Sequence, residues 1–221
     1  MNWKVFAVLF AFVFSLLPHR ISRAEGKFEK EIAAFVAHDK TNPPPQNAVL
    51  FVGSSSIRLW TNLPSDFPTF KTINRGFGGS QISDVIEYAD KIVIPYHPSK
   101  IVFYAGDNDL AASKSAEKVT ADFETFINRV RKDLPDTPIY FLSIKISRAR
   151  WYLAAEATKA NKLIQENITK SKNLHFIDVS TPLLNAKGEP DESLFQSDKL
   201  HLNSKGYAIW IPIVNKALKS N

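Results

Sequence analysis

Five short apolar runs alternate with amphipathic segments along this chain, and this alternation restricts its fold more than any other feature. The runs cover residues 48–52, 71–74, 101–105, 138–144 and 174–179. Such runs are typical of buried strands, and strands that alternate with helices form a parallel sheet with right-handed crossovers and helices on both faces. We therefore expect an α/β fold built on a five-stranded parallel sheet.

The segments around these runs have apolar residues at helical spacing. In the segment 115–132, for example, Val119, Phe123 and Phe126 fall on one face. No internal repeat is visible and no linker follows residue 45, so the pattern predicts one domain. We predict helices over residues 25–40, 81–92, 115–132, 152–170 and 204–219.

The length and composition agree with one globular domain. The chain has 221 residues, of which 44% are hydrophobic and 23% charged, which is enough for a full core. It has no cysteine, so it has neither disulfides nor thiolate metal sites. In an exported protein, this absence fits a bacterial periplasm or envelope better than a disulfide-dense extracellular scaffold.

The first 24 residues differ in kind from the rest. Lys4 precedes an almost unbroken apolar run over residues 5–17, and Ser22 and Ala24 place small residues at the spacing of a signal cleavage site. This layout is typical of a secretory signal peptide, because its apolar run is too short to span a bilayer comfortably. We predict a signal peptide over 1–24, a folded domain over 25–221 and a periplasmic or secreted location. An uncleaved N-terminal anchor is the alternative.

The positive charge of the chain gives little support to nucleic-acid binding. The formal net charge is +6, but residues 1–24 hold three basic residues and no acidic one, so the rest carries +3. The lysines are scattered, and the sequence has no zinc-finger or RNA-binding signature. We therefore expect no nucleic-acid partner.

The loops that follow the predicted strands carry the residues with candidate chemistry. In a parallel α/β sheet these loops lie along one edge, so residues far apart in the sequence meet there. Three of these loops carry such residues, and a fourth loop, before the last helix, adds the aspartate and histidine at 198 and 201. The residues concerned are Ser54, Ser55, Ser56, Gly78, Gly79, Asn108, Asp198 and His201.

These residues form a full set for acyl transfer to a serine. Such a reaction needs a hydroxyl, an imidazole that accepts its proton, a carboxylate that orients the imidazole, and donors for the oxyanion. Each group also has a purely structural interpretation. The serines are favoured helix caps, the glycines are suited to a tight turn, Asn108 to an Asx turn, and Asp198 with His201 to a cap before the last helix.

Four blocks, in their order and spacing, resemble the SGNH (GDSL) hydrolase family. They are FVGSSSIRLW at 51–60, NRGFGGS at 74–80, YAGDND at 104–109 and SDKLHLNSKGY at 197–207. The resemblance covers about residues 48–210. It implies a three-layer α/β/α sandwich with a flavodoxin-like sheet, which agrees with the strand count, and an ester hydrolase that uses no metal or other cofactor.

The resemblance also assigns roles to residues. Ser55 falls on the family's nucleophile, Asp198 on its orienting acid and His201 on its base. The oxyanion hole would use the amides of Ser55 and Gly79 and the side chain of Asn108. The aspartate that usually follows the first glycine is replaced by Ser54, which we expect to serve in loop hydrogen bonding.

A basic and aromatic segment follows the fourth predicted strand. Arg148, Arg150 and Trp151 form either a solvated loop or the border of the acyl or leaving-group pocket. In the second interpretation they bind the substrate and favour an anionic or sugar-like ester.

We predict an exported serine esterase of the lipase/acylhydrolase type that acts on carboxylic esters. A carbohydrate O-deacetylase of the cell envelope is an alternative that uses the same residues. A catalytically silent module that binds acyl or glycan ligands is another, because the first block is altered. No cluster has zinc-site spacing, and Asp107 and Asp109 offer too few oxygens for a hard cation, so we expect no metal.

Overall fold

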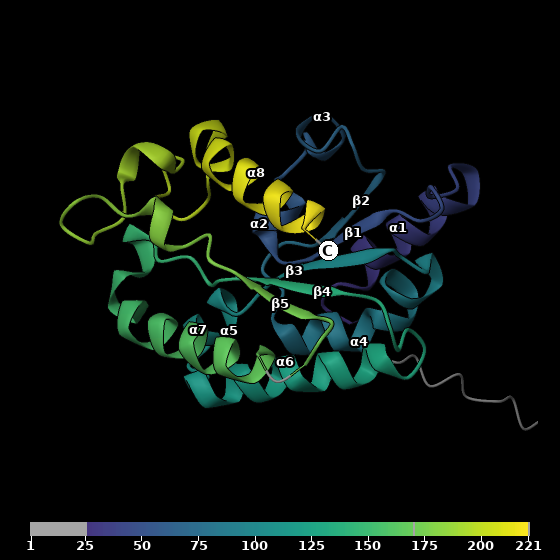
Figure 1. Ribbon diagram of the computed structural model, residues 1–221, viewed down its shortest axis with the longest axis horizontal. Coiled ribbons are helices and arrows are strands. Elements are labelled where there is room, and N and C mark those ends of the chain that lie inside the picture. The colour runs from purple at the N-terminus through teal and green to yellow at the C-terminus, as the bar shows by residue number, and fades with distance from the viewer. Residues whose placement is uncertain (1–25, 170, 221) are drawn as a thin grey trace, which may run out of the picture.

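The computed structural model describes residues 26–169 and 171–220 (Figure 1). The predicted signal peptide lies outside these residues and stays a prediction. Five parallel strands form one sheet in the order β2-β1-β3-β4-β5. The strands are β1 (Val49–Gly53), β2 (Thr72–Gly76), β3 (Lys100–Tyr104), β4 (Ile139–Leu142) and β5 (Leu174–Ile177).

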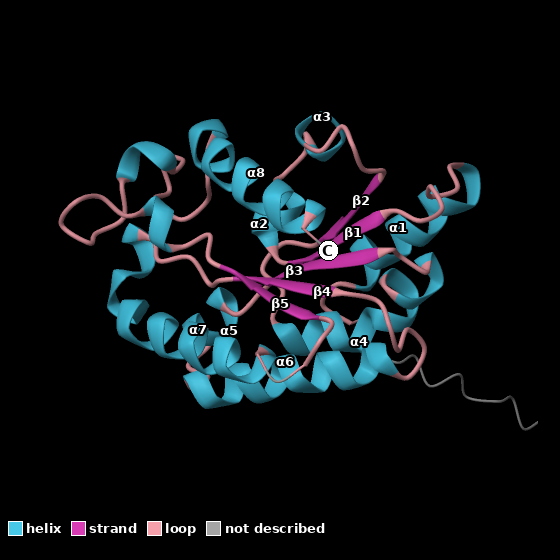
Figure 2. Cartoon of the chain, in the orientation of Figure 1, coloured by secondary structure: helices cyan, strands magenta, loops and turns pink. Residues whose placement is uncertain are grey.

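Helices cover both faces of this sheet (Figure 2). The α-helices are α1 (Glu29–Thr41), α2 (Ser55–Arg58), α3 (Leu63–Asp66), α4 (Ile82–Ile92), α5 (Asp107–Ala111), α6 (Ala116–Arg131), α7 (Ala154–Ile168) and α8 (Ser204–Lys219). The 3₁₀ helices are η1 (Ile94–Tyr96), η2 (Arg148–Leu153), η3 (Thr181–Leu183) and η4 (Glu192–Leu194). The strand order and the two helical layers confirm the predicted three-layer α/β/α fold.

The alternation of side chains along each strand divides the core into two halves. In β1, Leu50 and Val52 pack with α1, α4, α6 and α7, whereas Val49 and Phe51 pack with α2, α3 and α8. Successive side chains of a strand point to opposite faces, so a strand covered on both sides must be apolar throughout. All five residues of β1 are buried, which explains its unbroken apolar run.

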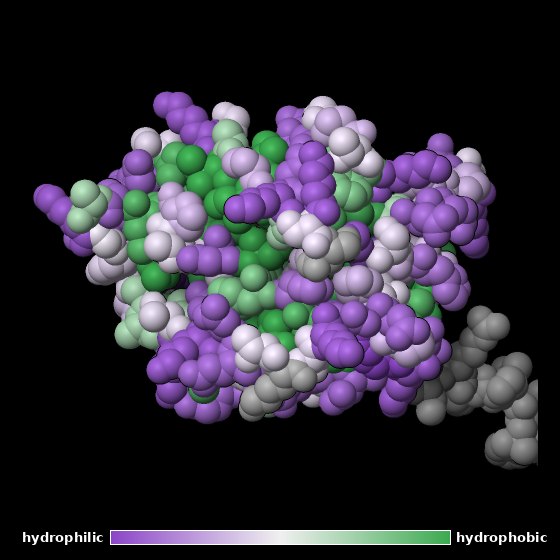
Figure 3. Space-filling model, in the orientation of Figure 1, coloured by the Kyte–Doolittle hydropathy of each residue, from purple (hydrophilic) through white to green (hydrophobic). Residues whose placement is uncertain are grey.

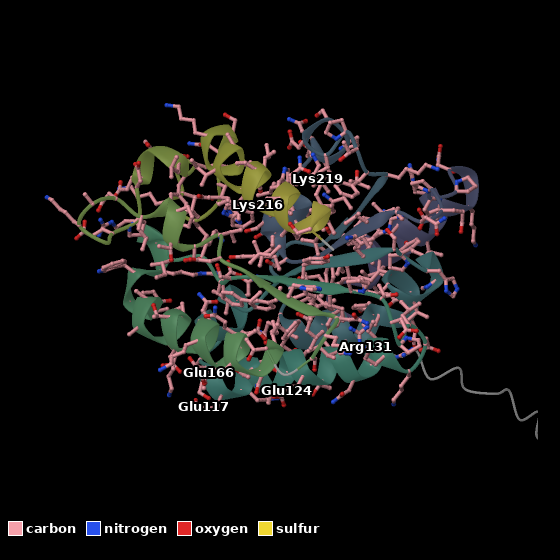
Figure 4. All side chains as sticks on the ribbon, in the orientation of Figure 1. Glu117, Glu124, Arg131, Glu166, Lys216 and Lys219 are labelled. Carbon is pink, nitrogen blue, oxygen red and sulfur yellow. The ribbon has the colours of Figure 1, made fainter. Side chains whose placement is uncertain are left out.

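The outer surfaces of α6 and α7 are polar. Figure 3 shows mainly hydrophilic residues over these two helices, and hydrophobic residues beside α8 and between it and the other two. Figure 4 labels Glu117 and Glu124 on α6, Glu166 on α7, and two lysines on α8. Glu117 pairs with Lys159 of α7 at 2.6 Å, so the charged faces of α6 and α7 also contact each other. No helix in the described ranges combines enough length and apolar character to cross a lipid bilayer.

Three short helices, α2, α3 and α5, lie outside the five predicted helical segments, and each has only four or five residues. The serines at 54–56 were expected as candidate helix caps, and α2 begins among them, whereas α3 and α5 were not predicted. A helical period cannot be recognised in so few residues. Two of them matter for function, because α2 follows β1 and α5 follows β3 at the carboxyl edge of the sheet.

Candidate active site

Ser55 is the first residue of α2, directly after the turn that ends β1. The turn depends on Gly53, whose φ of 135° is unfavourable for other residues. A Cβ at Gly53 would also lie 1.9 Å from the carbonyl oxygen of Tyr104. The carbonyl of Ser54 accepts hydrogen bonds from the amides of Ile57 and Arg58, which closes the first turn. Ser55 is thus held at the carboxyl edge of the sheet with 7% of its surface exposed.

His201 contacts both Ser55 and Asp198. Its Nε2 lies 3.0 Å from Oγ of Ser55, and its Nδ1 lies 2.6 Å from Oδ2 of Asp198. Ser55 and His201 are 146 positions apart in the sequence, yet these distances are those of direct hydrogen bonds. The structure therefore brings together the three residues that the sequence suggested as nucleophile, base and orienting acid.

Hydrogen bonds within the loop from Asp198 to His201 hold it in a fixed turn. Oδ1 of Asp198 accepts hydrogen bonds from the amides of Leu200 and His201, at 2.9 and 3.0 Å. Lys199 takes the left-handed conformation with a φ of 56°. The carbonyl of His201 accepts a hydrogen bond from the amide of Gln196, so the imidazole is carried by a fixed turn. Asn203, and not Asp198, caps α8, since its side chain accepts from the amides at the helix start.

The surroundings of Asp198 keep its carboxyl group ionised. Burial alone would raise the pKa of Asp198, but hydrogen bonds from the backbone and ring of His201 and from the Leu200 amide outweigh it. The resulting pKa is about 2. A carboxylate that stays charged holds the N–H of the imidazole on Nδ1, which leaves Nε2 free to accept a proton.

Two backbone amides near Ser55 are available to a ligand. In the part of the chain that the structure describes, neither the amide of Ser55 nor that of Gly79 donates a hydrogen bond to the backbone. Ser55 lies in the first turn of a helix, where amides have no partner within the helix. Gly79 has a φ of 76°, and apart from its chain neighbours no residue lies within 4 Å of the place where a Cβ would be. The surroundings of Gly79 are therefore open on that side.

Asn108, the second residue of α5, presents a side-chain amide to the same edge. Its Nδ2 donates to the carbonyl of Ser80 at 3.0 Å, and its Oδ1 accepts from Nη2 of Arg150 at 2.9 Å. A carboxamide nitrogen has two N–H groups, so one remains for a ligand.

Of the three adjacent serines, Ser55 alone has a hydroxyl bonded to an imidazole. The hydroxyl groups of Ser54 and Ser56 are buried and have no hydrogen-bond partner among the described residues. Ser54 takes part in loop hydrogen bonding, as expected, but through its backbone and not through its hydroxyl. Its amide donates to the carbonyl of Tyr104 at 2.8 Å.

A buried ion pair lies directly beside Asn108. Nζ of Lys145 is 2.9 Å from Oδ2 of Asp107 and 3.0 Å from the hydroxyl of Tyr104. The side chains of Lys145 and Asp107 are 1% and 6% exposed. Burial alone would raise the pKa of Asp107, but Lys145 and Arg150 hold it below its ordinary value. Nothing in the sequence predicts this burial, because a lysine just past a strand is usually exposed.

Lys145→Met is expected to lower the free energy of unfolding by about 3–5 kcal/mol, because it leaves the buried Asp107 carboxylate without its hydrogen-bonded cation and with only the more distant Arg150 beside it. Urea unfolding measures this loss. The double variant Lys145→Met, Asp107→Asn is the control, and it should recover most of the stability because it removes both charges. A single variant as stable as wild type would show that the pair contributes nothing to the loop.

The arginines of the basic segment after β4 pair with other groups of the protein. Arg148 pairs with Glu189 at 2.8 Å and with Glu192 at 3.1 Å, and its guanidinium stacks on Trp151. Arg150 contacts Asn108, as described above. Neither arginine is a free cation, so the predicted preference for an anionic substrate loses its main support. Trp151 remains 39% exposed.

Asp178, directly after β5, has a structural role. Its Oδ1 accepts hydrogen bonds from the amides of Ser180 and Thr181. Within residues 26–169 and 171–220, no group of three or more histidines and acids is arranged to hold a metal ion.

Comparison with protein families identifies the family of this chain. Residues 52–209 match the model of the GDSL-like Lipase/Acylhydrolase family. The chain belongs to this family, as its four sequence blocks indicated. A search of the curated proteins found no match.

Several solved structures have the same fold as this chain. A protein from Streptococcus pneumonia whose structure is named for platelet activating factor has a TM-score of 0.75 and 24% identity, covering 86% of this chain and 92% of its own. A GDSL-like lipase from Bacteroides thetaiotaomicron has a TM-score of 0.71 and 18% identity, covering 86% and 97%. A carbohydrate esterase family 3 protein from Talaromyces cellulolyticus has a TM-score of 0.63 and 17% identity, covering 78% and 96%. At these identities the likeness shows the fold alone.

Proposed function

We propose that this protein is a serine esterase that hydrolyses carboxylic esters with Ser55 as nucleophile, His201 as base and Asp198 as orienting acid. The observation that carries the proposal is the continuous contact from Ser55 Oγ to His201 to Asp198, at 3.0 and 2.6 Å. A nucleophile, a base and a group that orients the base, each within hydrogen-bond reach of the next, are what nucleophilic catalysis requires. The predicted export of the protein belongs to the same proposal.

The proposed reaction has two halves. Oγ of Ser55 bonds to the ester carbonyl carbon while its proton passes to Nε2 of His201. The tetrahedral intermediate then breaks its bond to the alkoxy oxygen, which leaves as an alcohol with the proton from His201. In the second half a water molecule gives a proton to His201 and bonds to the acyl carbon. The acid departs, and the proton returns to Ser55.

The developing oxyanion would be bound by three donors. They are the amides of Ser55 and Gly79 and the remaining N–H of Asn108, which come from three different loops at the carboxyl edge of the sheet. Donors that are already fixed need no reorganisation when charge appears on the substrate oxygen, and this lowers the barrier.

Asn108→Ala is expected to lower kcat by about 10²–10³-fold while KM changes little, because the lost donor acts on the oxyanion and not on the bound ester. Hydrolysis of a short-chain p-nitrophenyl ester measures the effect. Asn128→Ala, on the exposed side of α6, is the control and should retain full activity. A variant that lost only affinity for the ester would contradict the oxyanion role of Asn108.

A panel of esters tests the reaction and its substrate class together. It compares short-chain esters, fatty esters of rising chain length and acetylated sugars. The lipase-type proposal expects turnover of acyl esters, and the absence of any turnover would reject the esterase function. Labelling of the protein with a fluorophosphonate, lost in Ser55→Ala, separates an esterase from a silent binding module.

Carbohydrate O-deacetylation is a second candidate, which one observation favours. Trp151 and Tyr152 are 39% and 75% exposed, and they directly follow Arg150, which contacts Asn108. Exposed aromatic rings beside the site offer apolar area to a ligand with a flat, partly apolar face, such as a sugar ring. A preference for acetylated sugars that is lost in Trp151→Ala would support this candidate over the lipase type.

A further inference from the structure

We propose that Arg150 is a positioning residue of the oxyanion hole, which fixes the carboxamide of Asn108 with its N–H directed to the substrate. This inference rests on the proposed function and adds to it a residue that acts through Asn108. It replaces the interpretation of Arg150 as a contact for anionic substrates.

The carboxamide of Asn108 is held at both ends. Nη2 of Arg150 donates to its oxygen at 2.9 Å, and its nitrogen donates to the carbonyl of Ser80 at 3.0 Å. A flipped amide would place its nitrogen against a cation and its oxygen against a carbonyl. Both contacts would then be repulsive, so Arg150 and Ser80 together define one orientation.

Arg150 is itself fixed by groups on other elements. Its side chain is 21% exposed, and its Nη1 lies 3.6 Å from Oδ2 of Asp107, the buried partner of Lys145. Its amide donates to the carbonyl of Ser147 at 3.2 Å. The guanidinium is thus held by its ion pair with Asp107, although Nη1 makes no hydrogen bond among the described residues. Because the guanidinium is planar and rigid, it loses little further freedom when it bonds to Asn108.

The segment that carries Arg150 also contacts the loop of the proposed base. The amide of Ala149 donates to the carbonyl of Lys199 at 3.2 Å, and Lys199 lies between Asp198 and His201 in the sequence. The helix η2 therefore joins the two sides of the site. It contacts the donor at the oxyanion and the turn that carries the imidazole.

The positive charge of Arg150 strengthens the side-chain N–H of Asn108 as a donor to the oxyanion. A cation that donates to a carboxamide oxygen draws electron density away from the amide nitrogen, and charge-assisted hydrogen bonds are stronger than neutral ones. The remaining N–H of Asn108 becomes a better donor to a developing negative charge. The expected effect thus appears in the reaction of Ser55 with the carbonyl carbon, and not in the binding of the ester.

Arg150→Ala and Arg150→Lys test the proposal in the full-length protein. We expect Arg150→Ala to lower kcat by about ten- to a hundredfold at nearly constant KM, because a displaced donor loses most of its effect. Arg150→Lys keeps a positive charge and one donor, so it should recover part of the loss. Arg129→Ala is the matched control. This arginine pairs with Asp90 and Asp133, far from the site, and its loss should leave activity unchanged.

A double-mutant cycle with Asn108→Ala shows whether Arg150 acts through Asn108. If it does, the double variant is no slower than Asn108→Ala alone. Multiplied losses in the double variant would overturn the proposal. So would a defect limited to the KM of acidic esters, or full activity of Arg150→Ala in a folded protein.

The rate of fluorophosphonate labelling of Ser55 separates this inference from the proposed function. A wild-type protein that is labelled but hydrolyses no ester in the panel would reject the esterase proposal. The role of Arg150 would then be tested by the rate at which Ser55 is labelled in Arg150→Ala. We expect slower labelling of Arg150→Ala, and an unchanged rate would overturn the inference. A wild-type protein that is not labelled at all would overturn both.

Discussion

Ser55→Ala is expected to lower kcat for ester hydrolysis by about 10⁶-fold, since loss of the nucleophile from a serine triad costs about as much as loss of the whole triad. The variant should fold normally, because the hydroxyl of Ser55 has its one hydrogen bond among the described residues with the ring of His201. Hydrolysis of a p-nitrophenyl ester and labelling with a fluorophosphonate measure the loss. Intact mass followed by peptide mapping then identifies the labelled serine.

The neighbouring serines are the matched controls for this result. Ser54→Ala and Ser56→Ala each remove a buried hydroxyl that has no hydrogen-bond partner among the described residues, so both should keep most of the activity. A label found on Ser54 or Ser56, or a loss in Ser54→Ala as large as that in Ser55→Ala, would reject Ser55 as the nucleophile.

Asp198→Asn is expected to lower kcat by about 10⁴-fold. The side-chain nitrogen of an asparagine can donate to Nδ1 of His201, which would move the ring proton to Nε2, where it faces Ser55. Because the pKa of Asp198 is about 2, the wild-type carboxylate is ionised throughout the range in which esterases are assayed. The acidic limb of the wild-type pH profile should therefore report another group.

Asp191→Asn is the control for the loss of a carboxylate near the site. Asp191 also accepts a backbone hydrogen bond in an exposed turn, from the amide of Ser193, but it does not contact His201. Its substitution should leave kcat unchanged. A fall of less than tenfold in Asp198→Asn would show that the imidazole is oriented without this carboxylate.

Much of the fold was predictable because strands and helices leave periodic patterns in a sequence. The five predicted runs coincide with the five strands to within a few residues, and the predicted segment 204–219 matches α8 (Ser204–Lys219). The short helix α5 was not predicted, although it carries Asn108. Its residues have glycine and polar neighbours, so local propensity favours a turn as much as a helix.

The candidate site was predictable in part, for a different reason. Residues that end parallel strands meet at one edge, so Ser55, Asn108 and the loop of His201 were expected to converge. The contacts of Lys145 and Arg150 were not predicted. A basic residue after a strand has the same local sequence whether it is solvated or buried against an aspartate.

The sequence alone determined the layers of the fold, the edge at which the site lies and the residue types available there, because these follow from periodicity and from the order of strands and helices. The tertiary structure decided which of the three serines bonds to His201, and which acceptors Arg148 and Arg150 contact. Those choices depend on distances of about 3 Å between segments tens of residues apart, and such distances are fixed only when both halves of the core are packed.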